Sequence, residues 1–330
     1  MQQAKILLLA FSVWSCWVTA ALAEGDGPCP ELPKTLLRKL LYDEPYYLLE
    51  ELGKLETWMS QAGMRTWRDN VANVHGRADG SIDNATEIII GSHYDTVIDG
   101  GKYDGALGII VGIAAVKARM VQMAACKGYA TWQQLEALTV EPILDLRQLL
   151  GHKVLALLPQ PLHIIGFSDE EGVRFQSTFL GSKAVAGQLG GILEMEDASG
   201  ITIREALELH GYSLLEDSLQ AMKLPVDKVK AYFEVHIEQG PILESLNEPV
   251  GVVAGIAGQT RLYAVVKGEQ GHAGTVPMTL RKDPMVVAAR VIAKLEDICH
   301  EILANDTSSN LVCTAGAIYV YPNAGNVIPR

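Results

Sequence analysis

The chain has 330 residues, of which 48% are hydrophobic and 20% are charged. This balance is typical of a globular protein with room for two domains, and it excludes a disordered or fibrous chain. The formal net charge of −12 would repel a nucleic-acid backbone, so we expect no nucleic acid among the partners. The five cysteines include no C-x-x-C pair, and their spacing indicates neither a thiolate metal site nor a disulfide scaffold.

The first 23 residues have the pattern of a signal peptide. A short, weakly basic start is followed by the apolar run ILLLAFSVWSCWV and by ALA at 21–23, a small-residue cleavage site. The apolar run is too short to cross a bilayer comfortably, and we find no later stretch of 18 or more apolar residues. We therefore expect a protein of the secretory pathway, in the endoplasmic reticulum, with no membrane span after removal of the signal.

Three apolar runs alternate with helix-like segments in the next part of the chain. The runs are EIIIGSH at 87–93, LHIIGFSDEE at 162–171 and AYFEVHIEQ at 231–239, and the helix-like segments are 108–120 and 201–222. This rhythm predicts an α/β fold with a mainly parallel, mixed sheet flanked by helices. Each run ends in ionisable residues, and open α/β sheets bind their ligands at the carboxyl ends of the strands. We therefore expect the three clusters to form one site.

The pattern changes near residue 250. The segment IAGQTRLYAVVKG at 256–268 alternates like an exposed antiparallel strand, Asp283-Pro284 opens an amphipathic helix, and LVCTAGAIYVYP at 311–322 reads as a second strand. We expect a larger domain over 35–249 and a smaller α+β domain, inserted or appended, over 250–330.

The first ionisable cluster combines His93 and Asp95 in H-x-D spacing along a strand. Both side chains then face one side, so Asp95 could hold the imidazole while its other nitrogen binds a metal. A core histidine beside a turn aspartate is the alternative. Asp104, after a glycine-rich loop, is either a ligand that the loop returns to His93 or a helix N-cap.

The second and third clusters strengthen the metal interpretation. Glu170 and Glu171 in SDEEG could divide the work, one binding a metal and the other taking a proton from water, although acidic runs are commonly solvated loops. His236 follows the third run, where a lone histidine is more often structural. Histidines and carboxylates without sulfur suit Zn²⁺ or Mn²⁺. Two ions roughly 3.5–4 Å apart, bridged by Asp104, would activate a water molecule and polarise a carbonyl.

Several longer motifs carry a specific resemblance. These are GSHYDTVIDGGKYDGALGI, FSDEEGVRFQSTFLGSKAVAG, VHIEQGPILE, GIAGQTRL, GHAGTVPMTLRKDP and NVIP, in this order. They are similar to the plant allantoate deiminases, or allantoate amidohydrolases, in the carbamoylase branch of the two-metal zinc-exopeptidase-like hydrolases. The resemblance runs from about residue 35 to the end. It implies hydrolysis of allantoate to ureidoglycine, ammonia and carbon dioxide. A carbamoyl-amino-acid hydrolase, a ureidoglycolate amidohydrolase and a non-catalytic family member remain alternatives.

The resemblance also implies a role for each matching residue. One ion would be held by His93, Asp104 and His236, and the second by Asp104 and Glu171. The ions would be Mn²⁺, with Zn²⁺ as the alternative. Glu170 would be the general base, and Asp95 would orient His93.

The smaller domain would be a lid through which two chains form a homodimer. Its His272 would stabilise the developing oxyanion, while Arg261 and Asn326, together with Gln239 of the larger domain, would contact the ureide substrate. Each of these residues also has a structural alternative. Arg261 could be a surface charge, His272 a turn residue, and Gln239 and Asn326 loop residues that form hydrogen bonds.

Two departures from the family pattern stand out. Residues 124–160 occupy a place where the family has a short connection, so this segment is either an insertion or a gene-model artefact. The chain ends at NVIPR, where the family continues through a lid strand with a substrate-binding arginine and a last metal-ligating histidine. We therefore expect an incomplete lid and catalytic domain and a weakly held second ion.

Overall fold

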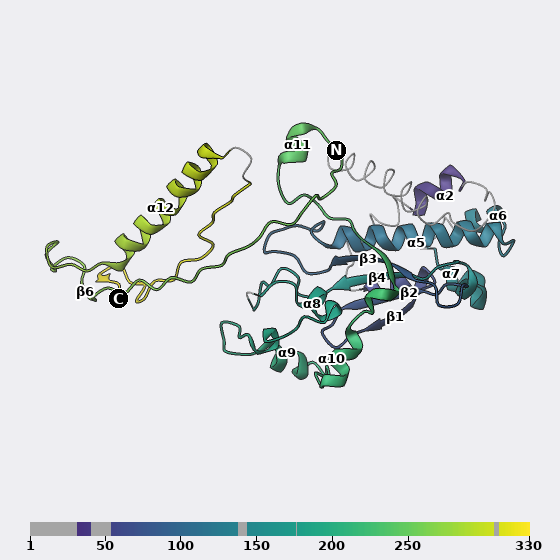
Figure 1. Ribbon diagram of the computed structural model, residues 1–330, viewed down its shortest axis with the longest axis horizontal. Coiled ribbons are helices and arrows are strands. Elements are labelled where there is room, and N and C mark those ends of the chain that lie inside the picture. Colours follow the sequence, from purple (N-terminus) through teal and green to yellow (C-terminus); the bar gives the residue numbers. More distant parts are fainter. Residues whose placement is uncertain (1–31, 41–53, 138–143, 176, 307–309) are drawn as a thin grey trace. The chain divides into compact units, whose positions relative to one another are not determined.

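The computed structural model describes residues 32–40, 54–137, 144–175, 177–306 and 310–330 (Figure 1). The chain divides into two compact units, the first ending at Val252 and the second beginning at Val253. The signal peptide expected over residues 1–23 lies outside the described residues.

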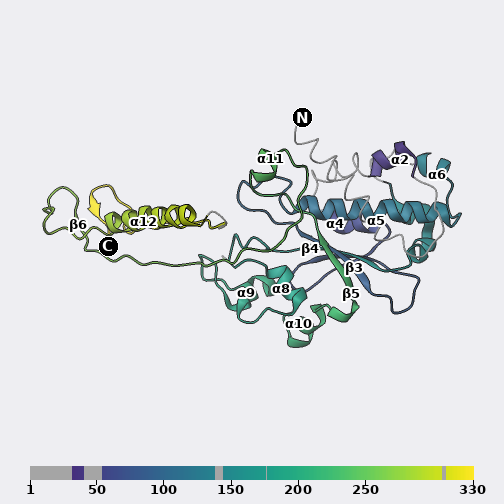
Figure 2. The ribbon, with the colours of Figure 1, turned by 45° about the horizontal axis from the view of Figure 1, so that its top comes forward.

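A five-stranded mixed sheet forms the centre of the first unit (Figure 2). Its strand order is β1-β2-β4-β3-β5. β3 pairs in parallel with both β4 and β5, whereas β1 and β2 run antiparallel at one edge. The strands are β1 Arg65–Arg68, β2 Val74–Ala78, β3 Glu87–His93, β4 Leu162–Phe167 and β5 Val229–Glu234. The predicted α/β class and the mixed sheet with a parallel centre are confirmed, and the three apolar runs are its three parallel strands.

Helices cover both faces of this sheet. Ile88 and Ile90 of β3 belong to the core cluster that includes α5, Ala106–Cys126, whereas Ile89 packs on the opposite face with Val185 of α8, Leu180–Ala186. The alternation follows from the two-residue period of a strand. Figure 1 shows α5 along one side of the strands and α8 on the other. Because β3 and β4 are buried on both faces, their sequences are continuously apolar rather than alternating.

Helix α5 is the longest element of the first unit and lies inside it. It is long and apolar enough to cross a membrane, but 83% of its most apolar window is buried in the structure, as in the core helix of a globular domain. Gly108 lets it approach the sheet, because a Cβ atom there would overlap the backbone oxygen of Val235 and the side chain of Ser92.

The unexpected segment 124–160 is part of the first unit's core. It contains the end of α5, then α6 Trp132–Ala137, α7 Leu146–Leu150 and the 3-10 helix η4 Gly151–Ala156. Leu135, Leu144 and Leu157 of this segment are almost fully buried in the same cluster as α5. Two helices earlier in the chain, α2 Lys34–Arg38 and α4 Leu55–Gln61, contribute to that cluster as well.

The helix-like segment 201–222 forms two helices rather than one. α9 is Ile203–Leu209 and α10 is Glu216–Met222, and Gly211 between them has φ of 84°, which a continuing helix does not permit. Thr202 and Glu205 form a capping box at the start of α9. Three further short helices are η5 Ile192–Glu194, η6 Val226–Lys228 and α11 Ile242–Leu246.

The second unit contains the predicted helix but not the two predicted strands. α12, Pro284–Asn305, begins after Asp283, whose side chain accepts a hydrogen bond from the amide of Met285. The expected strands at 256–268 and 311–322 are wrong: these segments carry no strand, and their apolar side chains, including Leu262 and Val312, are largely exposed. An alternating pattern becomes a strand only when a neighbouring strand pairs with its backbone. The unit's strands are two-residue elements, β6 Gly271–His272 and β7 Val327–Ile328, paired antiparallel.

The cysteine spacing indicated no disulfide scaffold, but the structure contains disulfide bonds. Cys299 of α12 is bonded to Cys313, with the two Cα atoms 6.5 Å apart, and Cys126 is disulfide-bonded too. Cysteine pairing depends on distance in the fold, and wide spacing in a long chain gives no indication of it.

Candidate metal centre

The carboxyl ends of the three parallel strands bring the predicted metal ligands together. His93 is the last residue of β3 and pairs with Phe167 at the end of β4, while His236 follows β5 by two residues. Ligand atoms of four residues all lie within 4.8 Å of one another: His93, Asp104, Glu171 and His236. The expectation that one sheet edge collects these side chains agrees with this geometry.

The glycine-rich loop returns Asp104 to His93. Gly105 has φ of 65°, and a Cβ atom at this position would overlap the His93 imidazole ring. A glycine is therefore required for the turn and for the close approach. Asp104 is not the N-cap of α5, because that position is Gly105 and makes no side-chain cap bond.

The hydrogen bonds of the two histidines leave their Nε2 atoms facing each other. The Nδ1 atom of His93 lies 2.7 Å from the backbone oxygen of Asp95, and that of His236 lies 2.7 Å from the backbone oxygen of Ile237. Since a carbonyl oxygen only accepts, each Nδ1 carries a proton, and Nε2 is the atom of each ring that is left to bind a metal. The two Nε2 atoms are 2.9 Å apart. Two lone pairs so close repel each other unless a proton or a metal ion lies between them.

The carboxylates complete a donor set that fits a divalent ion. The Nε2 atom of His236 is 3.6 Å from Asp104 Oδ1, and the Nε2 atom of His93 is 3.9 Å from Glu171 Oε1. Two imidazoles and two carboxylates without a thiolate suit Zn²⁺ or Mn²⁺. The residues present therefore fit a metal ion.

Asp95 contacts both the neighbouring loop and His93. Its two carboxylate oxygens accept hydrogen bonds of 3.0 Å from the amides of Glu170 and Glu171, while Oδ1 is 3.6 Å from His93 Nδ1. Burial tends to raise the pKa of Asp95, but these bonds and the charge of His93 outweigh it and lower the pKa. For His93, burial tends to lower the pKa, whereas the bonds to Asp95 and the charges of Asp95 and Glu171 raise it to about 9.

Glu170 lies beside the four-residue group rather than in it. Its carboxylate accepts hydrogen bonds from the hydroxyl and the amide of Ser182 at the start of α8. Burial raises the pKa of Glu170, against the effect of these hydrogen bonds. Burial and the charge of Asp95 also raise the pKa of Asp169 to about 6. A carboxylate with a raised pKa next to a metal centre has the properties of a proton acceptor.

Gln239 contacts the metal-ligand group directly. Its amide nitrogen lies 2.7 Å from Asp104 Oδ1 and 3.0 Å from Glu171 Oε1, so it donates to two carboxylates that would otherwise repel each other. Its backbone φ of 55° is uncommon for a residue other than glycine, and such conformations concentrate at functional sites.

The remaining predicted residues belong to the second unit. β6 and β7 bring His272 and Asn326 together, since the amide of Ala273 donates to the backbone oxygen of Asn326 at 2.9 Å. His272 Nδ1 accepts from the amide of Gly274 at 3.0 Å, and the Nε of Arg261 donates to Gln259 at 3.1 Å.

Thr96 and Ser182 are site residues that sequence reasoning missed. The hydroxyl of Thr96 donates to Asp104 Oδ2 at 3.1 Å, and that of Ser182 donates to Glu170. Both stand inside the quoted motifs, at HYDT and LGS, but a hydroxyl beside a strand end or a helix start gives no signal of its own in a single sequence.

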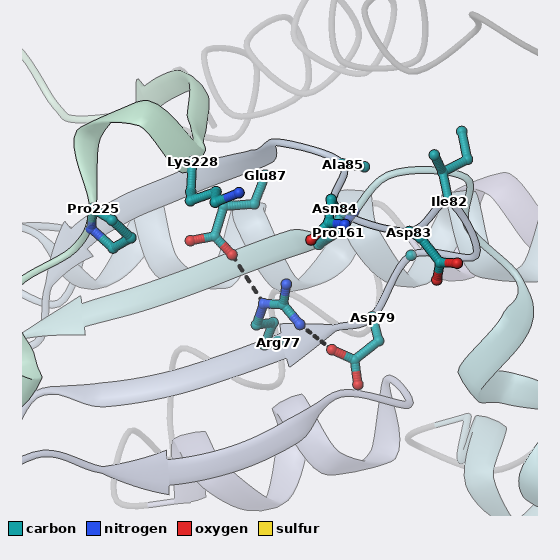
Figure 3. Close-up of a pocket in the computed structure, with 11 residues that line it drawn as sticks. Arg77, Asp79, Ile82, Asp83, Asn84, Ala85, Glu87, Pro161, Pro225 and Lys228 are labelled. Atoms are coloured by element: carbon teal, nitrogen blue, oxygen red, sulfur yellow. Dashed lines mark hydrogen bonds and ion pairs between the residues drawn. The ribbon is translucent and has the colours of Figure 1, made fainter.

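A separate pocket lies at the opposite, amino-terminal edge of the sheet (Figure 3). It is lined by Arg77, Asp79, Glu87 and Lys228, among others. Figure 3 shows Arg77 between Glu87 and Asp79, to which it is ion-paired. Since Arg77 pairs with both carboxylates, we assign the chemistry to the metal centre.

Known proteins resemble this chain along most of its length. No protein-family model matches it. It is 45% identical to allantoate deiminase 1 of Glycine max over 85% of this chain, and 40% identical to allantoate deiminase of Arabidopsis thaliana over 94% of this chain. The N-carbamoyl-L-amino acid amidohydrolase of Geobacillus stearothermophilus is 36% identical over 83% of this chain. The chain spans little more than half of these relatives, 55%, 60% and 58% of their lengths respectively.

Solved structures agree with the fold. An amidase of the hydantoinase/carbamoylase family from Burkholderia vietnamiensis matches with a TM-score of 0.59 and 26% identity, over 85% of this chain and 58% of that one. AtUAH in complex with glyoxylate matches with a TM-score of 0.61 and 24% identity, over 99% of this chain and 66% of that one. The mixed sheet and its helical layers match the fold of the hydantoinase/carbamoylase amidases. Within that class, the chain is a homologue of the plant allantoate deiminases.

Proposed function

We propose that the chain is a metal-dependent amidohydrolase that hydrolyses allantoate to ureidoglycine, ammonia and carbon dioxide. The observation that carries the proposal is the pair of facing Nε2 atoms of His93 and His236, flanked by Asp104 and Glu171. Allantoate is favoured over an N-carbamoyl amino acid because identity to the plant allantoate deiminases reaches 45%, against 36% for the N-carbamoyl-L-amino acid amidohydrolase of Geobacillus stearothermophilus.

We assign a first ion to His93, Asp104 and His236 and a second to Asp104 and Glu171. The ions, Mn²⁺ with Zn²⁺ as the alternative, supply a Lewis acid that polarises the scissile group and lowers the pKa of water. Glu170, with its raised pKa, takes the proton of the attacking water and passes it to the leaving nitrogen. Asp95 fixes the backbone of both glutamates. Gln239 binds the ureide from beside the carboxylates.

The direct test is ammonia release from allantoate by the purified chain. The protein is first stripped with a chelator and then reloaded with Mn²⁺ or Zn²⁺, and Glu171→Gln protein serves as the matched control. Metal-dependent release from allantoate, absent in the control, is the expected result. If release from an N-carbamoyl amino acid or from ureidoglycolate is faster, that compound is the substrate instead of allantoate. No release from any of the three compounds would favour a non-catalytic family member.

The second unit is proposed as the substrate lid. Its His272 would donate to the developing oxyanion, and Arg261 and Asn326 would bind the polar ends of the ureide. We expect His272→Ala to reduce turnover by about 10²–10³-fold, the scale for an oxyanion donor, with unchanged metal content. Metal analysis alongside the ammonia assay checks this, and normal turnover would contradict the assignment.

We also propose that the chain forms a homodimer through the second unit and acts in the endoplasmic reticulum after removal of residues 1–23. Exposed apolar side chains on α12, including Val287, Val291 and Ile298, support an interface. The Cys299–Cys313 disulfide supports an oxidising compartment. Light scattering on the purified chain tests the dimer, and a fluorescent fusion of the chain tests the location.

A further inference from the structure

The acidic residues of the proposed site stand on a segment that leaves the end of β4 and returns to the start of α8. Its two arms, 168–171 and 179–182, lie side by side: the amide of Gly181 donates to the oxygen of Ser168 at 3.0 Å, and the amide of Phe179 donates to the oxygen of Glu170 at 2.9 Å. The positions of Glu170 and Glu171 therefore depend on what holds these arms together.

Asn73 contacts both arms from a third element. It comes just before β2, whose first residue, Val74, pairs with Gly166 near the end of β4. The side-chain oxygen of Asn73 accepts from the amide of Ser168 at 3.0 Å, and its nitrogen donates to the backbone oxygen of Gly181 at 3.0 Å. One fully buried amide thus bridges the beginning of one arm and the end of the other.

Chemistry leaves Asn73 only one orientation. The oxygen of Gly181 and the carboxylate of Asp69 accept hydrogen bonds, so the NH₂ group must face them; it donates to Asp69 Oδ2 at 2.8 Å. The amide of Ser168 donates, so the side-chain oxygen must face that side. Asp69 also accepts from the backbone amides of Val71 and Asn73, which fixes the turn that carries Asn73.

The same turn is joined to the metal-ligand strand. The hydroxyl of Tyr94, next to His93, donates to the backbone oxygen of Ala72 at 2.9 Å. Ala72 has φ of 69°, a conformation that a residue other than glycine keeps only when its surroundings impose it. The chain beyond Gly181 then continues directly to Ser182, which holds the Glu170 carboxylate.

We propose that Asn73 is a positioning residue that sets the carboxylates of Glu170 and Glu171 at the metal centre by holding the two arms of this segment together. Aspartate at this position would face the Gly181 oxygen and Asp69 with a negative charge, and alanine would leave the buried amide of Ser168 unsatisfied. Neither change touches a proposed metal ligand. The inference rests on the proposed function for the metal, but the hydrogen-bonded clamp itself can be tested without it.

The experiment uses the full chain with Asn73→Asp and Asn73→Ala. The matched control is Leu162→Ala, which truncates a buried side chain at the other end of β4. Two quantities are measured at a temperature where all variants are folded by circular dichroism: the affinity for Mn²⁺ and for Zn²⁺ by calorimetry, and the hydrogen-exchange rates of individual backbone amides.

We expect the Asn73 variants to bind the ions about 10–100-fold more weakly, the range for residues that orient metal ligands, while the control stays close to wild type. The amides of Glu170 and Glu171 should exchange about tenfold faster or more, with Ile90 in β3 unchanged. The inference would be overturned if both Asn73 variants had the same metal affinity and the same amide exchange rates as Leu162→Ala. If the wild-type chain binds neither ion, the proposed function fails, and the exchange rates of the two glutamates still decide whether Asn73 positions them.

Discussion

At the scale of single residues, His93, Glu171 and His236 became candidates because ionisable residues at the ends of apolar runs meet at one sheet edge. Asp104 became one through the glycine-rich loop, and the family resemblance assigned the ligand roles. How they are held could not be predicted in the same way. The Nδ1 atoms of His93 and His236 form hydrogen bonds with backbone oxygens. The carboxylate of Asp95 accepts hydrogen bonds from two backbone amides of the loop after β4. Every residue has a backbone oxygen, so hydrogen bonds to the backbone cannot be predicted from residue types.

The two adjacent glutamates should respond differently to the same substitution. Glu170→Gln removes the proton acceptor but no metal ligand, so we expect metal to be retained and turnover to fall roughly 10²–10⁴-fold. Glu171→Gln removes a ligand, so we expect metal loss. Atomic absorption with the ammonia assay separates the two effects, and equal metal loss in both variants would refute the division of roles.

Gly101 and Gly105 lie on either side of Asp104, and substitutions at the two positions can be compared to test the role of the glycine-rich loop. Both have positive φ, but a Cβ atom would overlap the His93 ring at Gly105 and would meet nothing within 4 Å at Gly101. Gly101→Ala should therefore cost only backbone strain, about 1 kcal/mol, whereas Gly105→Ala should in addition displace His93 and lower metal affinity. Chemical denaturation and metal titration measure the two effects. Unchanged affinity in Gly105→Ala would show that the His93 ring tolerates the displacement.

At the scale of elements, the strands that could be predicted were the three apolar runs, of which β3 and β4 are buried on both faces while β5 alternates between half-buried and exposed residues. β3, β4 and β5 were visible as apolar runs, whereas β1 and β2, with the sequences RTWR and VHGRA, have too many polar residues for that signal. The helix α12 was predicted because Asp283-Pro284 marks its start. The strands expected at 256–268 and 311–322 were wrong because alternation describes what one face of a strand could bury, and pairing requires a neighbour.

Glu87 joins three strands and should make stability depend on pH. Burial tends to raise its pKa, but hydrogen bonds from His163 of β4 and Arg77 of β2 lower it to about 2. Burial lowers the pKa of His163, so Arg77 is the charged partner at neutral pH. A depressed carboxyl pKa stabilises the folded state above the unfolded-state pKa, here about 4.5, and this contribution is lost as the pH falls toward 2.

The corresponding test compares wild-type protein with Glu87→Gln in urea denaturation between pH 7 and pH 3. The substitution should cost about 1–3 kcal/mol at pH 7, because it removes the charge that Arg77 pairs with inside the sheet. The difference between the two proteins should shrink toward low pH. A constant difference across this range would mean that Glu87 does not carry the effect.

At the scale of the whole molecule, the ligands found among the described residues are shared unequally between the two proposed ions. The first ion would have two imidazoles and a carboxylate, but the second would have only Asp104, shared, and Glu171. After dialysis without added metal we expect close to one ion per chain, with a second returning only in excess Mn²⁺. Metal analysis before and after dialysis decides this, and two ions surviving dialysis would require further ligands among the residues present.

The burial of α5 depends on segments of the chain that are synthesised after it. During synthesis this helix leaves the ribosome before β4 and β5, which later cover it, and in the finished fold 83% of its most apolar window is hidden. A nascent chain that has emerged only as far as η4 therefore lacks the strands β4 and β5, and part of the apolar surface of this 21-residue helix stays uncovered. Pairing of β4 with β3 therefore does more than extend the sheet: it completes the burial of a helix whose length and apolar composition would otherwise suit a membrane.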